Sequence, residues 1–232
     1  MKIRLDGLQY VLFPPENPQT DWRPLYEESF KFWQDSWSKT FEELEGKGRV
    51  YSDDFCRQNQ IGAVTFEGKC VALGLFHELD FTLATSRSDS NFQAWPDQAI
   101  QKLIADGPRI LVGSNLVVHP DYRGDVGNGL KLKDLMLGLM VKTLLATGCD
   151  AMSGTARVNR GVDEVAVRYG GTPVSENVKY HGVDVQLIAF YRRRVEKLAL
   201  FSDIGVENLW RTRKELGART PYLELQKTGE NR

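Results

Sequence analysis

Cysteine and histidine are scarce in this chain, which holds three of each among 232 residues. The cysteines Cys56, Cys70 and Cys149 are odd in number, widely spaced and free of any CxxC pair, and no histidine stands at metal-ligand spacing. These absences argue against a disulfide-stabilised secreted scaffold and against a zinc site. We therefore expect three reduced thiols and no bound metal.

An excess of charge of one sign is also missing, because 30 lysines and arginines are balanced by 31 aspartates and glutamates. Such a balance gives no reason to expect nucleic acid or anionic lipid as a partner. The apolar run at 135–141 is far too short to span a bilayer, and the first residues lack the apolar core of a signal peptide. We expect a cytoplasmic protein with no nucleic-acid partner and no membrane span.

The chain does have the length and hydrophobic content of an ordinary globular protein, with 41% hydrophobic and 26% charged residues. It contains no internal repeat and no low-complexity linker, so we expect a single domain over residues 1–232. Predicted strands and helices alternate irregularly along the chain. This order favours an α/β or α+β fold with helices on both faces of one sheet.

Hydrophobic periodicity predicts where these elements lie. The expected strands span residues 2–13, 61–66, 70–76, 109–118, 151–158, 174–180 and 183–191. The expected helices span residues 21–44, 97–105, 130–148, 160–169 and 192–219, and residues 81–96 are expected to be irregular or mobile. Asp21 is the expected N-cap of the first helix and Gly148 the expected C-cap of the third. The first helix has an aromatic face, which is typical of core packing and also suits one wall of an apolar binding slot.

The most informative stretch is the glycine cluster at residues 124–129, which lies between a predicted strand and a predicted helix. Backbone N–H groups of such a turn, together with the helix dipole, favour a phosphate-bearing ligand. The dinucleotide fingerprint fails because Leu132 replaces its last glycine. The Walker loop fails because Leu130 and Lys131 replace its Lys-Ser/Thr pair. A glycine turn with a purely structural role remains an alternative.

A third template fits better. The stretch resembles the acyl-CoA-binding motif of the GCN5-related N-acetyltransferases (GNAT), a strand ending in V-x-P followed by R/Q-x-x-G-x-G/A-x-x-L. Residues 118–120 read V-H-P, Arg123 is the basic residue, and 127–132 read G-N-G-L-K-L. The interval from Arg123 to Gly127 is one residue longer than in the family. The resemblance implies that the acyl-CoA is bound by Leu116, Val117, Val118, Arg123, Gly124, Val126, Gly127, Asn128, Gly129 and Leu130.

A second, more degenerate patch extends the resemblance to about residues 60–192. Asn159 and Gly170 have the family's spacing, and Asn159 is a further expected CoA contact. The family's helical tyrosine, which protonates the departing thiolate, falls on Ala166, and Tyr169 stands one turn away. The resemblance implies a GNAT-like mixed, mostly antiparallel twisted sheet with a splayed central strand. The chain is longer than the minimal version of this fold, and we expect the excess to form an extended aromatic N-terminal helix and a C-terminal helical extension.

The implied reaction is the transfer of an acetyl or longer acyl group from a CoA thioester to an amine by direct attack. Free backbone groups of the splayed strand would stabilise the charge on the thioester carbonyl. The family's strand glutamate falls on Ser114 and Asn115, so Glu78 at the end of the preceding strand, its neighbour His77, and a chain of water molecules are the alternative bases. The candidate catalytic residues are therefore Glu78, Ser114, Asn115 and Tyr169.

Two other functions stay open. The related acyl-homoserine-lactone and N-acyl amino acid synthases take long acyl chains from carrier proteins, which would make an acyl carrier protein a partner. A non-catalytic protein that binds CoA or an acyl ligand is the second, because both the base and the acid positions have changed. The acceptor is expected to be a small amine, an amino acid or a protein terminus, and a homodimer is compatible with the sequence.

Overall fold

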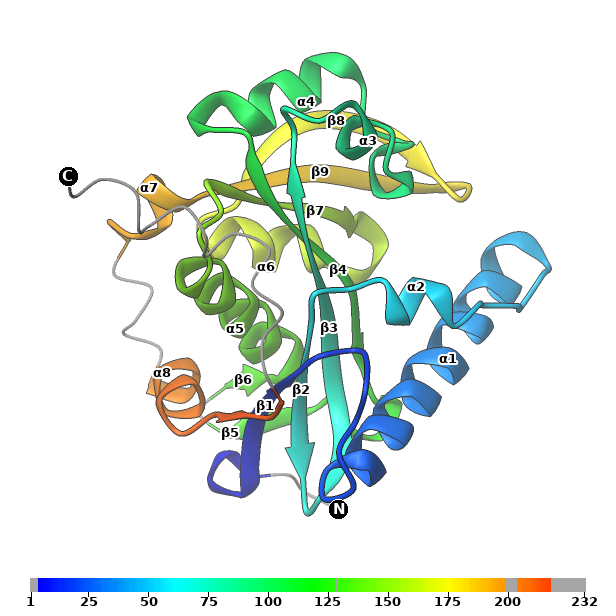
Figure 1. Ribbon diagram of the computed structural model, residues 1–232, viewed down its shortest axis with the longest axis vertical. Helices are drawn as coiled ribbons and strands as arrows, with labels where there is room; N and C mark the ends of the chain where they lie inside the picture. The colour runs from blue at the N-terminus through cyan, green and yellow to red at the C-terminus, as the bar shows by residue number, and fades with distance from the viewer. Residues whose placement is uncertain (1–3, 128, 199–203, 218–232) are drawn as a thin grey trace.

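A computed structural model describes residues 4–127, 129–198 and 204–217 of the chain (Figure 1). Its centre is an eight-stranded sheet with the order β10-β1-β2-β3-β4-β7-β9-β8. The strands are β1 (Leu8–Phe13), β2 (Gln60–Phe66), β3 (Lys69–Asp80), β4 (Arg109–Val118), β7 (Ala151–Arg157), β8 (Thr172–Tyr180), β9 (Val183–Tyr191) and β10 (Lys214–Glu215). The β1–β10 and β4–β7 pairs are parallel and every other neighbouring pair is antiparallel. The predicted mixed, mostly antiparallel sheet is confirmed.

Two tight hairpins set the register at either side of the sheet. Glu67 and Gly68 join β2 to β3 with φ angles of 50° and 79°, and His181 and Gly182 join β8 to β9 with φ angles of 50° and 75°. Two successive positive φ values are the signature of a turn whose twist matches antiparallel strands. The strands expected at 61–66 and 70–76, and those expected at 174–180 and 183–191, thus form two antiparallel hairpins.

Helices cover both faces of the sheet, as the sequence predicted (Figure 1). On one face, α1 and α2 pack over β1–β3, while α3 and α4 pack over the other half. On the opposite face lie α5, α6 and α8, whose side chains join the largest core cluster. The helices are α1 (Arg23–Glu45), α2 (Asp53–Cys56), α3 (Ala84–Arg87), α4 (Asp97–Leu103), α5 (Leu132–Ala146), α6 (Val162–Arg168), α7 (Arg192–Val195) and α8 (Ile204–Arg211).

The aromatic face of α1 packs into the core at its N-terminal end. Its N-terminal half, with Trp22 and Tyr26, packs against Phe13 and Phe55. The prediction that Asp21 caps this helix is wrong, because the N-cap is Trp22 and no side chain caps the first turn.

The irregular segment at 81–96 is held to the sheet by three buried aromatic side chains, Phe81, Phe92 and Trp95.

The expected long helix at 192–219 is wrong over the described residues. After α7 the chain forms the separate helix α8, and β10 then adds an edge strand beside β1. Arg192, the first residue of α7, donates from its guanidinium to the carbonyls of Leu144 and Thr147 and so joins α7 to the C-terminal end of α5. The C-cap of α5 is Thr147 rather than Gly148.

The central strand β4 is splayed, as predicted. It pairs with β7 only where Ile110–Val112 meet Ala151–Ser153, and beyond this point the two parallel strands diverge. On its other side β4 carries a bulge, because Asn115 and Leu116 together face Gly74 of β3 between the pairs at 73/117 and 75/114. Asn115 has a φ of 54°, a left-handed conformation that asparagine tolerates better than most residues. The fold thus opens a gap in the middle of its sheet.

Candidate functional site

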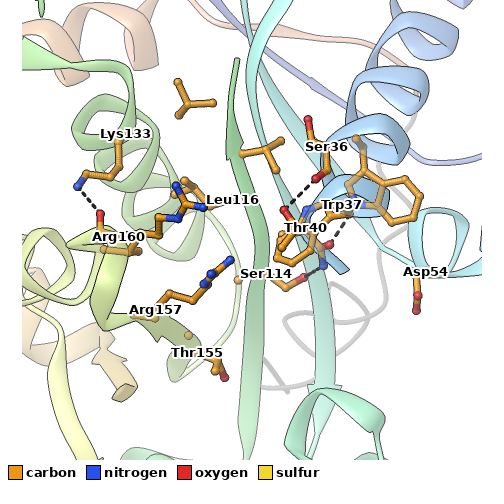
Figure 2. A pocket seen from close by; sticks show the side chains of 18 of the residues that line it. Ser36, Trp37, Thr40, Asp54, Ser114, Leu116, Lys133, Thr155, Arg157 and Arg160 are labelled. Atoms are coloured by element: carbon orange, nitrogen blue, oxygen red, sulfur yellow. Dashed lines mark hydrogen bonds between the residues drawn. The ribbon is translucent and has the colours of Figure 1, made fainter. Parts of the chain in front are cut away.

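A cavity of about 1150 Å³ occupies the gap between β4 and β7. Toward α5 its wall is apolar and is formed by Leu137, Met140, Ala166, Ile188 and Phe190. Toward α1 the wall is aromatic and polar and includes Trp37, Thr40, Thr155, Arg157 and Tyr180. Figure 2 shows the residues of α1 on one side of β4 and the arginines that follow β7 on the other. The cavity therefore joins an apolar compartment to a polar one through the splayed sheet.

The β4 bulge is held in place from α1. The fully buried indole of Trp33 donates to Oδ1 of Asn115 over 3.0 Å, and Nδ2 of Asn115 donates to Oγ of Ser114 over 3.2 Å. All three residues line the cavity. No carboxylate or imidazole of the described chain is hydrogen-bonded to Ser114 or Asn115. This hydrogen-bonded chain orients the bulge but contains no strong base.

The described lining of the cavity carries more positive than negative side chains. Its cations are Lys31, Lys39, Arg57, Arg123, Lys131, Lys133, Arg157 and Arg160, and its anions are Glu28, Asp35, Glu43 and Asp54.

Every one of these carboxylates already has a partner. Asp35 pairs with Lys31 at 2.7 Å, Asp54 with Arg57 at 3.3 Å and Glu43 with Arg160 at 3.6 Å. Glu28 accepts a hydrogen bond from the backbone N–H of Cys70. The remaining cations give the cavity a positive potential that favours anionic ligands.

The glycine cluster forms a hairpin rather than a loop that leads directly into the helix. β5 (Asp125–Gly127) pairs with β6 (Leu130–Lys131), and α5 starts only at Leu132. The N–H of Gly129, whose φ is 77°, donates to Oδ2 of Asp125. The expected set of free amides is therefore reduced by one. Asn128, another expected contact, lies outside the described residues.

Cations cluster beside this hairpin. Arg123 donates to the carbonyl of Val118, and Lys133 donates to the carbonyls of Arg160 and Gly161. Lys131, at the N-cap of α5, is exposed and lines the cavity. Three positive side chains thus lie at the positive end of the α5 dipole, an arrangement that suits phosphate groups.

No family model matches the sequence, and no curated protein matches it. Solved structures do match the fold. The acyl-homoserine-lactone synthase LasI is 15% identical, with a TM-score of 0.55, and the match covers 84% of this chain and 94% of LasI. The CoA-dependent acyl-homoserine lactone synthase BjaI, solved with SAM and isopentyl-CoA, is 15% identical, with a TM-score of 0.61 and coverage of 92% and 95%. FeeM, an N-acyl amino acid synthase from uncultured soil microbes, is 10% identical, with a TM-score of 0.52 and coverage of 85% and 98%.

This chain has the GNAT fold. The motif at 118–132 therefore predicted the architecture correctly, even though its glycine spacing departs from the family pattern. The splayed strand that the resemblance implied is present, and a helix follows the glycine hairpin.

The structure brings together about half of the expected GNAT site residues. Ser114, Asn115, Leu116, Val117, Val118 and Arg123 line the cavity. The described lining does not include Gly124, Val126, Gly127, Gly129, Leu130 or Asn159. Val126 is buried in the core below α5, Leu130 packs beside it, and Asn159 is exposed on the turn that follows β7. The hairpin and core packing account for Val126, Gly127, Gly129 and Leu130, whereas Gly124 and Asn159 are exposed and belong to neither.

Two expected catalytic residues lie away from the cavity. Glu78 is paired in register with Leu111, a core residue on the α5 face, and its N–H donates to Oδ1 of Asn59. Tyr169 is buried just after α6, where its ring lies against Gly138 of α5. Neither residue lines the cavity, so the expectation that Glu78 and Tyr169 take part in proton transfer is not supported by their positions.

Sequence reasoning missed the cations Lys131, Lys133, Arg157 and Arg160. Arg157 and Arg160 flank Asn159, the residue at the GNAT asparagine position, and this proximity could have marked them as cavity residues. Nε of Arg157 is buried and has no hydrogen-bond partner. Burial, and then the nearby Arg160, lower the pKa of Arg157, while Glu43 acts in the opposite direction.

Other chemistry has little support in the described residues. No group of three or more His, Cys, Asp or Glu gathers there as a metal ion would need, and the three cysteines are free thiols. None of the described helices has the length and apolarity needed to cross a bilayer. The cavity is therefore the feature on which a function can be built.

Proposed function

We propose that this protein is an N-acyltransferase that moves an acetyl or longer acyl group from a thioester to an amine by direct attack. The observation that carries the proposal is the cavity through the β4–β7 divergence, which is open to an apolar compartment on one face and a polar one on the other. Donor and acceptor can enter such a cavity from different sides and meet beside β4. Proximity of this kind is a large part of catalysis in two-substrate reactions.

The donor would lie along the free edge of β4. No described strand pairs with Gly113–Val118 on the side of the gap, so these backbone groups are available to the pantetheine amides and to the thioester oxygen. Lys131 at the N-cap of α5, together with Arg123 before the glycine hairpin, would hold the phosphates of CoA. These residues suit acyl-CoA, and the same edge would accept the phosphopantetheine arm of an acyl carrier protein.

The apolar compartment favours an acyl group longer than acetyl. Its wall under α5 is made of aliphatic and aromatic side chains, among them Met140 and Phe190. BjaI, which has the same fold, was solved with isopentyl-CoA. A short branched or medium-length chain would bury apolar surface in this compartment at about 25 cal/mol per Å².

The chemical step is a balanced acyl transfer. The amine nitrogen attacks the thioester carbon, a C–N bond forms, the C–S bond breaks, and the thiol carries away the proton that the amine loses. Ser114 and Asn115 border the cavity and provide polar groups, but neither is a strong base. We therefore propose that water within the cavity relays the proton, with the departing thiolate as its final acceptor.

A second candidate is a non-catalytic protein that binds CoA or an acyl ligand. The observation that favours it is the position of Glu78 and Tyr169 outside the cavity. Neither the general base nor the acid that protonates the thiolate in the family then has a side chain here to supply it. Binding of acyl-CoA without turnover would be its signature.

The test is to incubate the protein with acetyl-, isopentyl-, octanoyl- and dodecanoyl-CoA and a panel of amines that includes the common amino acids. Mass spectrometry detects N-acyl products, and a thiol reagent follows release of CoA. Amide product with at least one donor supports the proposal. Binding of acyl-CoA with no product from CoA or from acyl carrier protein donors overturns it in favour of the second candidate. Product only from acyl carrier protein would identify the synthase-like donor.

A further inference from the structure

Arg157 is an unusual cation within the cavity. Its Nε is shielded from solvent without a hydrogen-bond partner, and no ion pair joins its guanidinium to a carboxylate of the described chain. Arg157 is half-buried, and its shielded Nε carries a desolvation cost that no described counter-charge offsets. A ligand that supplies a carboxylate or phosphate would remove that cost.

Among the arginines of the polar compartment, Arg157 is the one that no described carboxylate pairs with, and the other unpaired cation, Lys39 of α1, is exposed. Arg160, three residues along, is paired with Glu43 of α1, and Arg57 is paired with Asp54. The ammonium of Lys133 already donates hydrogen bonds to two backbone carbonyls. An anion that enters between α1 and β7 would therefore find one uncommitted guanidinium at Arg157.

The strand places Arg157 on the acceptor side of the sheet. Side chains alternate along β7, so Met152 and Ala156 join the core under α5 while Thr155 and Arg157 point to the opposite face. Figure 2 shows Arg157 directed from β7 toward β4, where Ser114 lies. A molecule bound to Arg157 would thus lie across the gap from the β4 bulge, on the face of the sheet opposite the apolar compartment.

We propose that Arg157 binds the carboxylate of the acyl acceptor, and that the acceptor is an α-amino acid or a similarly small amine that carries a carboxylate. This inference rests on the proposed acyl transfer and adds the substrate class. The planar guanidinium matches a carboxylate through two parallel hydrogen bonds. A carboxylate fixed there leaves the amine of a small amino acid free to point into the gap where the thioester carbon would lie.

A phosphate of the donor is the competing anion, and the geometry favours it less. Lys131 and Arg123 already offer cations at the exposed mouth beside the α5 N-terminus. Arg157 lies farther along the gap, past Arg160 and next to Thr155, whose hydroxyl accepts a hydrogen bond from Trp95. A single guanidinium with one positive charge suits a monoanion better than a phosphate that carries two charges.

The first arm of the test compares each acceptor amino acid with its α-carboxamide in turnover. Wild-type protein should prefer the acid by roughly 10- to 100-fold in kcat/KM, mostly through KM, because a charge-assisted pair is lost with the amide. Arg157→Met should bring the ratio close to one without changing KM for acyl-CoA, and Arg157→Lys should restore part of it. Arg211→Met, which removes an exposed arginine on α8 outside the cavity, is the matched control.

The second arm does not depend on turnover. Isothermal titration with an N-octanoyl amino acid and with its carboxamide should show roughly 10-fold or greater preference for the acid in wild type and none in Arg157→Met. Arg157-dependent binding without any turnover would reject acyl transfer and keep the carboxylate site. Turnover with equal use of acids and amides, or a raised KM for acyl-CoA in Arg157→Met and Arg157→Lys, would overturn the carboxylate site and assign the guanidinium to another role or to the donor phosphate.

Discussion

The indole N–H of Trp33 donates a 3.0 Å hydrogen bond to Oδ1 of Asn115 and so ties helix α1 to the bulge of β4 across 82 residues of sequence. Trp33 is fully buried, and Asn115 occupies a left-handed conformation with a φ of 54°. The bond joins the left-handed backbone at Asn115 to α1, which forms one wall of the polar compartment. The position of the bulge thus depends on α1 as well as on the sheet.

Removal of the Asn115 amide should destabilise the fold. Asn115→Ala leaves a buried indole donor unsatisfied and places alanine at a positive φ, so a loss of about 1–3 kcal/mol is expected. Asn115→Gly removes the bond but tolerates the φ, and should cost less. Urea unfolding of Trp33→Phe, Asn115→Ala and the double variant measures the coupling. A coupling of about 1 kcal/mol is expected, and strictly additive effects would show that the bond contributes nothing.

Arg192 should contribute more to stability than its neighbour in the Arg192-Arg193-Arg194 run. Its guanidinium donates to the carbonyls of Leu144, Leu145, Thr147 and Cys149 at the end of α5. Arg192→Met should lower the free energy of unfolding by about 2 kcal/mol, because several carbonyls lose a charged donor at the negative end of the helix.

Arg193→Met is the matched control, because the Arg193 side chain is exposed. Its effect should stay within about 0.5 kcal/mol. Chemical denaturation gives both values, and equal losses for the two variants would contradict the capping role.

His77 should make stability sensitive to mild acid. Burial lowers the pKa of this imidazole below its ordinary value of 6.5, with the nearby Arg57 acting in the same direction and Asp89 opposing it. Below pH 6.5 the unfolded chain therefore binds more protons at this residue than the folded protein does, so the stability contribution is complete above pH 6.5 and is lost as the pH falls. His77→Asn should flatten the fall in free energy of unfolding between pH 6.5 and pH 5. An unchanged slope in urea titrations over this range would refute the assignment.

Lys131 should contribute to the affinity for CoA but not to the stability of the fold. It is exposed, it lines the cavity, and no described side chain pairs with it. Lys131→Met should weaken CoA binding by roughly 3- to 10-fold, with a smaller salt dependence, and leave thermal unfolding of the free protein unchanged. Arg211→Met again provides the control, and equal CoA affinities for both variants would remove Lys131 from the phosphate site.

The sequence predicted the sheet and most helices because their signals are local. The hydrophobic run at 109–118 matches β4 residue for residue, and the turns at 67–68 and 181–182 fixed two hairpins. The C-terminal segment was mispredicted because at residues 214–215 a long-range contact, the pairing of β10 with β1, replaces the helix that its composition favours.

The site was harder to predict than the fold. The residues of the β4 strand at 114–118 were found because the GNAT motif is continuous in sequence. The direction of Glu78 depends on the register of β3 against β4, and the burial of Tyr169 depends on α5 and α8, so neither follows from local spacing. Arg157 stands out only when the partners of every other charge around the cavity are known.

The central claim is that the gap between β4 and β7 takes the acyl thioester. Photocrosslinking with a medium-chain acyl-CoA that carries a diazirine near the end of its chain, followed by peptide mapping, tests it most directly. We expect label on the apolar wall, at α5 near Leu137 and Met140 or at β9 near Ile188 and Phe190, with loss of label when unmodified acyl-CoA competes. Label confined to surfaces outside this wall, or insensitive to competition, would contradict the account.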